Sequence, residues 1–325
     1  MNGQMRLNRR QLLAGAGSAL LCPHASAAAQ SDSSKPHTID VRTPQDLKDF
    51  FHYTKDRIAF ISSHRGGPRK GFPENCLATF DNTLRHTYSL IEIDPHYTKD
   101  GAIVLMHDPT LDRTSAGHGQ TSDYTLEELK KLKLKHPYGN VTGESIPTLD
   151  EALEWAKGKT ILILDQKNVP IEMRIKKIEE HYAEAHAIVM AYSFADAEKS
   201  YRLNPNVMME VFIPTGKEAA QFDATGVPWS SIVAFVTHLE PKDSGIFQMV
   251  HEKGAMCIRG SSRNIDKEYT TGKIDRAELM NGYHRIIESG ADIVEADLGI
   301  EAGEGVRALR PANSSKQKYF RLPRA

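Results

Sequence analysis

The sequence has little of what marks several common classes of protein. Its 325 residues include only three cysteines and two tryptophans, and its formal net charge is −1. So few cysteines do not make a disulfide framework, and no Cys-x-x-Cys pair is present for a thiolate zinc site. Whether Cys76 and Cys257 pair is left open. A charge near zero provides no basic field, so no nucleic-acid partner is expected.

Long hydrophobic runs are also missing. The apolar stretch 12–21 is too short to span a bilayer, so no stable membrane insertion is expected. It follows Arg9-Arg10 and precedes the small residues of 25–29, where cleavage is possible. This pattern is typical of a secretory signal peptide over residues 1–29, and the paired arginines favour the twin-arginine type over an ordinary signal. We expect an exported protein, periplasmic or secreted, with one domain over residues 30–325.

Short apolar runs alternate with amphipathic stretches along the rest of the chain. The runs expected to be strands are 58–64, 90–97, 103–108, 160–167, 187–193, 207–213, 231–237, 255–261 and 291–298. Their apolar, β-branched character suits strands buried on both faces, and the helices expected between most of them favour a parallel sheet. Those helices are expected at 44–55, 75–86, 147–157, 171–184, 194–203, 241–253 and 276–289.

The runs 90–97 and 103–108 lie too close together to be parallel neighbours. A parallel crossover needs about a dozen residues or more, whereas Asp100-Gly101 is a hairpin turn signal. The later run is therefore expected to fold back on the earlier one, which leaves eight parallel strands. We predict a (β/α)8 TIM barrel with a β-hairpin excursion after strand 2, and this hairpin should bring His107 near Glu92.

Acidic side chains follow the first strands, at the end of the barrel where TIM-barrel active sites lie. Glu92 and Asp94 are two residues apart on one strand and so share a face, and Asp165 ends the next parallel strand. Carboxylates side by side on a buried face repel unless a cation holds them. Oxygen ligands favour a hard ion, so we predict one divalent cation, Ca²⁺ or Mg²⁺, at these three residues. The alternative is a salt-bridge network with Arg65 and Lys167.

Two histidines, His64 and His107, are expected at strand ends beside these carboxylates. Hydrolysis of a bond with a poor leaving group needs one group that takes a proton from the nucleophile and another that gives one to the leaving oxygen, and a histidine pair can do both. Arg65 can present a fork of donors to the oxygens of an anion such as a phosphate, and Lys167 adds a point charge. Each of these two basic residues can instead be a countercharge to the carboxylates.

The ordered set of motifs resembles the glycerophosphodiester phosphodiesterase family. The motifs are His64-Arg65-Gly66, Pro73-Glu74-Asn75, Glu92-Ile93-Asp94, and Gly101 to His107-Asp108 followed by Leu111-Asp112-Arg113-Thr114. The resemblance implies that the two histidines are the acid–base pair and that glycerophosphodiesters are hydrolysed to glycerol 3-phosphate and an alcohol. The family usually has Glu-x-Lys where this chain has Asp165-Gln166-Lys167.

Other polar residues are expected around the site or in its supporting loops. Glu74 is expected to orient His64, Arg65 or a metal-bound water from outside the first ligand shell. Asn75 fits this region or a helix N-cap, and Asp108 with Asp112-Arg113 fits a role in loop structure. Further along the chain, the residues that face either the pocket or interior ion pairs are Glu210, Arg259, Glu295 and Asp297.

Two rival functions remain at this level. One is a phospholipase-D-like or phosphoinositide-cleaving lipid phosphodiesterase on the same barrel, although no clear hydrophobic loop is present to bind an intact lipid. The other is an exported non-catalytic binding protein, which the complete set of histidines and carboxylates disfavours. The sequence leaves open the alcohol of the diester, the metal, the acid and base assignments, the nucleophile and the oligomeric state.

Overall fold

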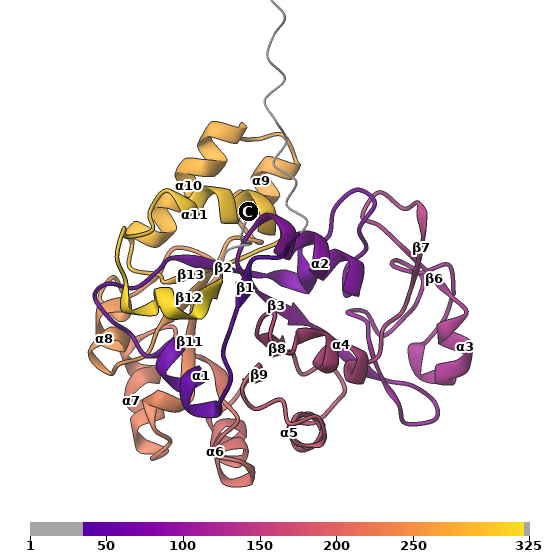
Figure 1. The fold of residues 1–325 in the computed structure, drawn as a ribbon, viewed down its shortest axis with the longest axis horizontal. Helices are drawn as coiled ribbons and strands as arrows, with labels where there is room; N and C mark the ends of the chain where they lie inside the picture. The colour runs from indigo at the N-terminus through magenta and orange to yellow at the C-terminus, as the bar shows by residue number, and fades with distance from the viewer. Residues whose placement is uncertain (1–34, 322–325) are drawn as a thin grey trace, which may run out of the picture. The chain divides into compact units, whose positions relative to one another are not determined.

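The computed structural model describes residues 35–321, so the signal expected over residues 1–29 lies outside the described part, and export stays a prediction. Eight parallel strands form the closed barrel that the sequence predicts (Figure 1). These strands are β2 (Phe60–Ser63), β3 (Ser89–Ile93), β8 (Leu162–Leu164), β9 (Ala187–Ala191), β10 (Met209–Phe212), β11 (Ile232–Thr237), β12 (Cys257–Gly260) and β13 (Ile293–Ala296). They follow one another around the barrel in chain order, and β13 pairs with β2 to close it.

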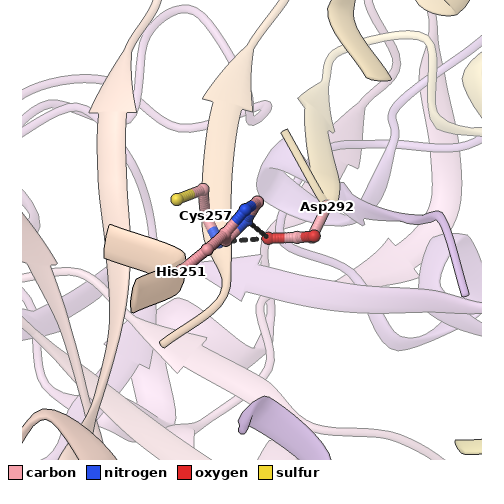
Figure 2. Close-up of side chains that lie close together, drawn as sticks. All are labelled: His251, Cys257 and Asp292. Atoms are coloured by element: carbon pink, nitrogen blue, oxygen red, sulfur yellow. Dashed lines mark hydrogen bonds and ion pairs between the residues drawn. The ribbon is translucent and has the colours of Figure 1, made fainter. Parts of the chain in front are cut away.

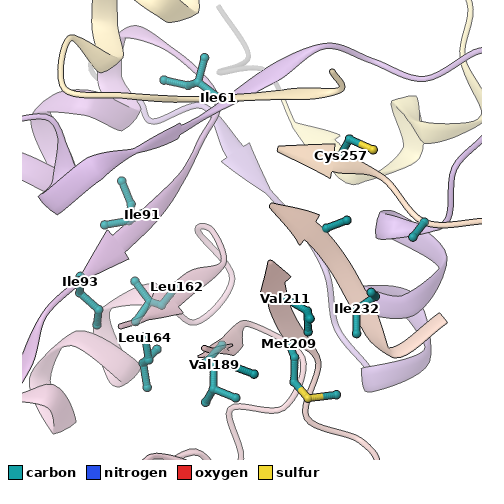
Figure 3. Packing of buried hydrophobic residues seen from close by; sticks show 14 of the residues in the cluster. Ile61, Ile91, Ile93, Leu162, Leu164, Val189, Met209, Val211, Ile232 and Cys257 are labelled. Atoms are coloured by element: carbon teal, nitrogen blue, oxygen red, sulfur yellow. The ribbon is translucent and has the colours of Figure 1, made fainter. Parts of the chain in front are cut away.

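The barrel strands bury both faces, as their apolar composition predicts. Alternate residues, such as Leu90 and Ile163, belong to one buried cluster inside the barrel. The residues between them, such as Ile61 and Ile91, belong to a second cluster under the surrounding helices, and Figure 3 shows members of this outer layer. Because side chains alternate along a strand, every second residue of each strand points into the barrel. The last of these residues lie at the C-terminal mouth of the barrel.

Helices follow most strands and surround the barrel (Figure 1). Their bounds are α2 (Leu77–His86), α4 (Leu149–Ala156), α5 (Ile171–Glu180), α6 (Phe194–Leu203), α7 (Gly216–Ala224), α8 (Ile246–Glu252), α9 (Ile265–Thr270), α10 (Arg276–Glu288) and α11 (Gly299–Arg307). Of these, α7, α9 and α11 were not predicted from the sequence. Among residues 35–321, no helix is both long and apolar enough to cross a bilayer.

The N-terminal end of the barrel is closed by α1 (Pro44–Phe51). Its N-cap is Thr43, whose hydroxyl accepts from Asp46 N, as the Thr-Pro start predicts. The helix buries Leu47 and Phe50 in the inner cluster. The short strands β1 (Thr38–Ile39) and β14 (Phe320–Arg321) pair antiparallel beside it. An active site is therefore expected at the opposite, C-terminal end of the barrel.

The chain leaves the barrel between β3 and β8. The strand expected over 90–97 divides at Asp94, because β4 (Pro95–Tyr97) pairs antiparallel with β5 (Ile103–Leu105) outside the barrel. Gly101 supplies the left-handed turn with φ 81°. Met106 N then donates to Asp94 O at 2.8 Å. The predicted hairpin is confirmed, and it returns His107 to the end of β3.

A small subdomain extends this excursion and was not predicted. It contains α3 (Leu126–Lys130) and the antiparallel strands β6 (Lys133–Lys135) and β7 (Val141–Ser145). Its own apolar core includes Val104, Met106 and Leu134. Figure 1 shows these elements to one side of the barrel, beyond α2 and α4.

Candidate active site

The loop after β2 places the first motif by means of left-handed backbone. Arg65 has φ 52° and Gly66 has φ 85°. A Cβ atom on Gly66 would lie 2.3 Å from the Phe80 ring, so only glycine fits here. Arg65 N donates to Glu92 Oε2 at 2.8 Å, which fixes the loop to β3. Non-glycine residues in this region cost about 1–3 kcal/mol and persist where the surrounding structure imposes them, often at functional sites.

Three carboxylates meet at the ends of β3 and β8, as predicted. One oxygen each from Glu92, Asp94 and Asp165 lies within 4.8 Å of the others, and all three residues are buried. Burial and the adjacent Asp94 carboxylate raise the pKa of Glu92 well above its ordinary value. A buried set of oxygen donors whose charges oppose one another fits a hard divalent cation. The donor set contains no sulfur or nitrogen that would favour a softer metal.

The polar neighbours of this cluster hold its members in place. Asn75 Nδ2 donates to Asp94 Oδ2 at 2.6 Å, and Asp94 N donates to Asn75 Oδ1 at 3.0 Å. The Tyr192 hydroxyl donates to Asp165 Oδ1 at 2.5 Å. Asn75 is thus not the cap of α2, whose N-cap is Cys76. No sequence motif indicated Tyr192, which lies one residue after β9.

Lys167 lies among the same carboxylates. Its Nζ is 3.0 Å from Asp94 Oδ1 and 2.5 Å from Asp165 Oδ2. Its backbone is left-handed, with φ 38°. Burial alone would lower the pKa of Lys167, but Asp94 and Asp165 outweigh it and raise the pKa. The ammonium group is therefore charged at the site, where it both balances the carboxylates and is available to a phosphate.

Each predicted histidine is held through Nδ1 by a carboxylate. His64 Nδ1 is 2.6 Å from Asp297 Oδ1, and His107 Nδ1 is 2.7 Å from Asp108 Oδ1. Because an ionised carboxylate only accepts, Nδ1 donates in both pairs and Nε2 is left for chemistry. Burial alone would lower the pKa of His64, but Asp297 and Glu92 outweigh it and raise the pKa to about 10.

A chain of ion pairs connects the two sides of the site. Arg113 donates to both oxygens of Glu74, at 2.7 and 2.8 Å, and its Nε donates to Asp108 at 2.6 Å. Arg65 Nη1 lies 3.4 Å from Glu74 Oε1. Glu74 therefore orients Arg65, one of the roles expected for it. Asp108 and Arg113, expected to have only a loop role, also hold His107.

The structure assigns each of the four residues for which the sequence allowed either the pocket or the barrel interior. Asp297 directly follows β13 and pairs with His64, so it belongs to the site. Glu210 and Glu295 are buried inside the barrel. Both oxygens of Glu210 lack a hydrogen-bond partner among residues 35–321. Arg259 pairs with Glu240 on the β11–α8 side of the barrel.

A second group of possible metal ligands lies at the other end of the barrel. It consists of His251, Cys257 and Asp292. Figure 2 shows the Cys257 sulfur directed away from the Asp292 carboxylate. That carboxylate accepts from His251 Nε2 at 2.9 Å and from Cys257 N at 2.7 Å, and it also pairs with Arg57. Arg57 balances the charge of this carboxylate, and His251 and Cys257 N donate to it. We therefore interpret the group as a buried ion-pair anchor and not as a metal site. Both Cys76 and Cys257 are free and buried.

Replacing this anchor should cost stability. We expect Asp292→Ala to lower the free energy of unfolding by about 3 kcal/mol, because a buried carboxylate with several donors is lost and Arg57 is left unpaired. Urea unfolding followed by circular dichroism measures the change. The control is Glu304→Ala, which removes the exposed pair with Arg276 at 2.5 Å and should cost less than about 1 kcal/mol. Equal losses in the two variants would contradict the anchor.

The barrel and the polar cluster at its C-terminal mouth define a TIM-barrel phosphoric diester hydrolase. Residues 64–255 match the model of the glycerophosphoryl diester phosphodiesterase family. The chain belongs to this family. It is 37% identical over 245 residues to a glycerophosphodiester phosphodiesterase of Caldanaerobacter subterraneus subsp. tengcongensis, covering 73% of this chain and 93% of that relative.

Two further similarities agree with this membership. A glycerophosphodiester phosphodiesterase of Bacillus altitudinis is 31% identical over 160 residues, which cover 46% of this chain and 65% of that relative. A crystal structure of a glycerophosphoryl diester phosphodiesterase from Parabacteroides distasonis superposes with a TM-score of 0.85 at 43% identity. That match covers 89% of this chain and 100% of the other.

Proposed function

We propose that this protein hydrolyses glycerophosphodiesters to glycerol 3-phosphate and an alcohol, with the aid of one divalent cation, Ca²⁺ or Mg²⁺. The observation that carries the proposal is the pairing of each histidine with a carboxylate through Nδ1, beside three buried carboxylates and two basic side chains. Family membership supports the substrate class, because the relatives carry the same activity in their names. Its substrate is a small phosphodiester.

The cation would be held by Glu92, Asp94 and Asp165. When bound, it supplies positive charge that stabilises the charge developing on the phosphate oxygens. The guanidinium of Arg65 and the ammonium group of Lys167 add positive charge beside the same phosphate oxygens. Asn75 and Tyr192 keep the carboxylate oxygens from rotating away. The substrate phosphate is thus bound between the β2 loop and the ends of β3 and β8.

The histidines move the protons of the reaction. A nucleophilic oxygen forms a bond to phosphorus as the bond from phosphorus to the alcohol oxygen breaks. One histidine takes the proton of the nucleophile on Nε2, and the other gives its Nε2 proton to the departing oxygen. Asp297 and Asp108 keep the two rings in the orientation that presents Nε2. The nucleophile is either water or the vicinal hydroxyl of the substrate, and both routes use the same pair.

A substrate panel tests the proposal against its lipid rival. We expect release of glycerol 3-phosphate from deacylated glycerophosphodiesters at a kcat/KM at least tenfold above that for lysophospholipids, since phosphate and polar groups dominate the site. A coupled glycerol-3-phosphate dehydrogenase assay measures the product. Cleavage of lysolipids alone would establish the lipid phosphodiesterase instead. Binding without turnover of any diester would favour a non-catalytic binding protein.

A further inference from the structure

A cavity of about 770 Å³ adjoins the β2 and β13 side of the site. His64, Arg65 and Asp297 form its inner wall. Its outer walls come from three places: the loop after β2 with Arg69 and Lys70, the β6–β7 turn with Tyr138, and the segment from α9 to the start of α11. This volume is in the range of pockets that bind small molecules and exceeds what a bare phosphate fills.

The cavity lies away from the carboxylate cluster. None of Glu92, Asp94 and Asp165 lines it, and neither does Lys167. A phosphodiester has two arms joined at phosphorus. We place the glycerol arm beside Glu92, Asp94 and Asp165, where the cation would be held. The other arm, which leaves as the alcohol, then points across the phosphate towards β2 and β13 and into this cavity.

The ion pairs of the cavity leave one lysine of its lining, Lys70, without a carboxylate partner in the described part of the chain. Each of its carboxylates is already in an ion pair: Asp297 with His64, and Glu74 with Arg65 and Arg113. Glu301 pairs with Arg69 at 3.2 Å, whereas Lys70 forms no ion pair within residues 35–321. The start of α11 has no side-chain cap, so its free N–H groups add partial positive charge. A cationic alcohol finds no unpaired carboxylate here and is repelled by the ammonium group of Lys70.

The apolar part of the lining suits the carbon–hydrogen faces of a polyol. The Tyr138 side chain is 75% exposed at the mouth. Tyr269 and Ile274 line the facing wall. An acyl chain would need a continuous apolar surface, but here it would have to cover the ion pair of Arg69 and Glu301, which costs the hydration of both groups.

We propose that this cavity receives the leaving alcohol and selects a neutral or anionic polyol, such as inositol or glycerol, over a cationic amino alcohol such as choline. The proposal rests on the proposed function and deepens it. Lys70 is its specificity residue, because its ammonium is the unpaired charge on the outer wall. Tyr138 contributes a stacking surface for the ring or chain of the polyol.

The test compares two substrates on three proteins. We measure kcat/KM for glycerophosphoinositol and for glycerophosphocholine with the wild-type protein, Lys70→Glu and a control, Lys55→Glu. Lys55 is an exposed lysine at the opposite end of the barrel. The wild type should prefer glycerophosphoinositol by about tenfold or more, as one charge at short range allows. Lys70→Glu should erase or reverse this ratio, and Lys55→Glu should leave it unchanged. Tyr138→Ala should raise KM for glycerophosphoinositol by about threefold or more with kcat retained.

The outcomes separate the cavity from the reaction. Equal efficiency on the two diesters, or a preference for glycerophosphocholine, overturns the cavity assignment while the hydrolase function stands. A ratio that Lys70→Glu and Lys55→Glu change equally also overturns it, because the effect would then come from net charge. If neither diester is cleaved by the folded wild type with Ca²⁺ or Mg²⁺ present, the proposed function fails and the cavity assignment fails with it.

Discussion

Alanine at His64 or at His107 is expected to lower kcat on a glycerophosphodiester by roughly 10²–10⁴-fold in a protein that still folds. Each ring has its Nδ1 paired with a carboxylate, which leaves Nε2 available for proton transfer. Removal of either ring deletes one of the two proton transfers that the reaction needs. The loss should appear in kcat rather than in KM, because proton transfer is made in the transition state.

The two carboxylates behind the rings provide a graded comparison. Asp297→Asn and Asp108→Asn keep the size of the side chain but remove the charge that holds Nδ1–H. We expect each to lower kcat less than the matching histidine variant does, since the ring remains but its orientation and protonation change. Asp112→Asn is the matched control, because Asp112 pairs with the exposed His118 at 3.1 Å and lies outside the site.

The measurements are initial rates at saturating substrate, with circular dichroism to establish that each variant is folded. A His64→Ala or His107→Ala protein with near-normal kcat would contradict the acid–base pair. The double variant should be little worse than the single ones, because the two groups act in one concerted exchange and their losses do not add. Additive losses would instead indicate two independent contributions to binding.

The barrel and most of the residues at the centre of the site could be predicted from the sequence. Strand positions followed from apolar runs, and the short gap around Asp100-Gly101 correctly predicted a hairpin instead of a ninth barrel strand. The carboxylates Glu92 and Asp94 were found because they are two residues apart on one predicted strand and so share a face. These signals are local: a run, a turn or a spacing of two residues is enough to recognise each of them.

Contacts between distant segments were not readable in the same way. Asp297 pairs with His64 across 233 positions of the chain, and only the closure of the barrel between β13 and β2 brings them together. Tyr192 reaches Asp165 from the next strand, and nothing around it marks it as polar and functional. The β6–β7 subdomain was missed because its strands are short and half-polar, so they lack the buried-strand signal.

Removal of divalent cations is expected to abolish turnover, and the carboxylate cluster is the reason. Its three members are buried, with oxygens within 4.8 Å of one another. Burial and the adjacent Asp94 raise the pKa of Glu92, and a bound cation would favour the ionised form of this carboxylate. EDTA should lower the rate by at least about 10²-fold, and Ca²⁺ or Mg²⁺ should restore it. A rate that EDTA leaves unchanged would exclude the cation from the mechanism.

Variants then separate the cluster from other buried acids in the barrel. Glu92→Gln should raise the cation concentration that gives half-maximal activity, the midpoint, by about tenfold or more, because a charged ligand becomes a neutral one. Glu210→Gln is the matched control: Glu210 is equally buried on β10 but is not a member of the cluster. It should leave the midpoint nearly unchanged.

Cation binding is also measurable without substrate, since a ligand that binds only the folded state raises stability by about 2.7 kcal/mol at one hundred times its Kd. The thermal shift with Ca²⁺ or Mg²⁺ should therefore persist in Glu210→Gln and shrink in Glu92→Gln. Equal shifts in both would mean that the cation binds elsewhere, even if the rate depends on it.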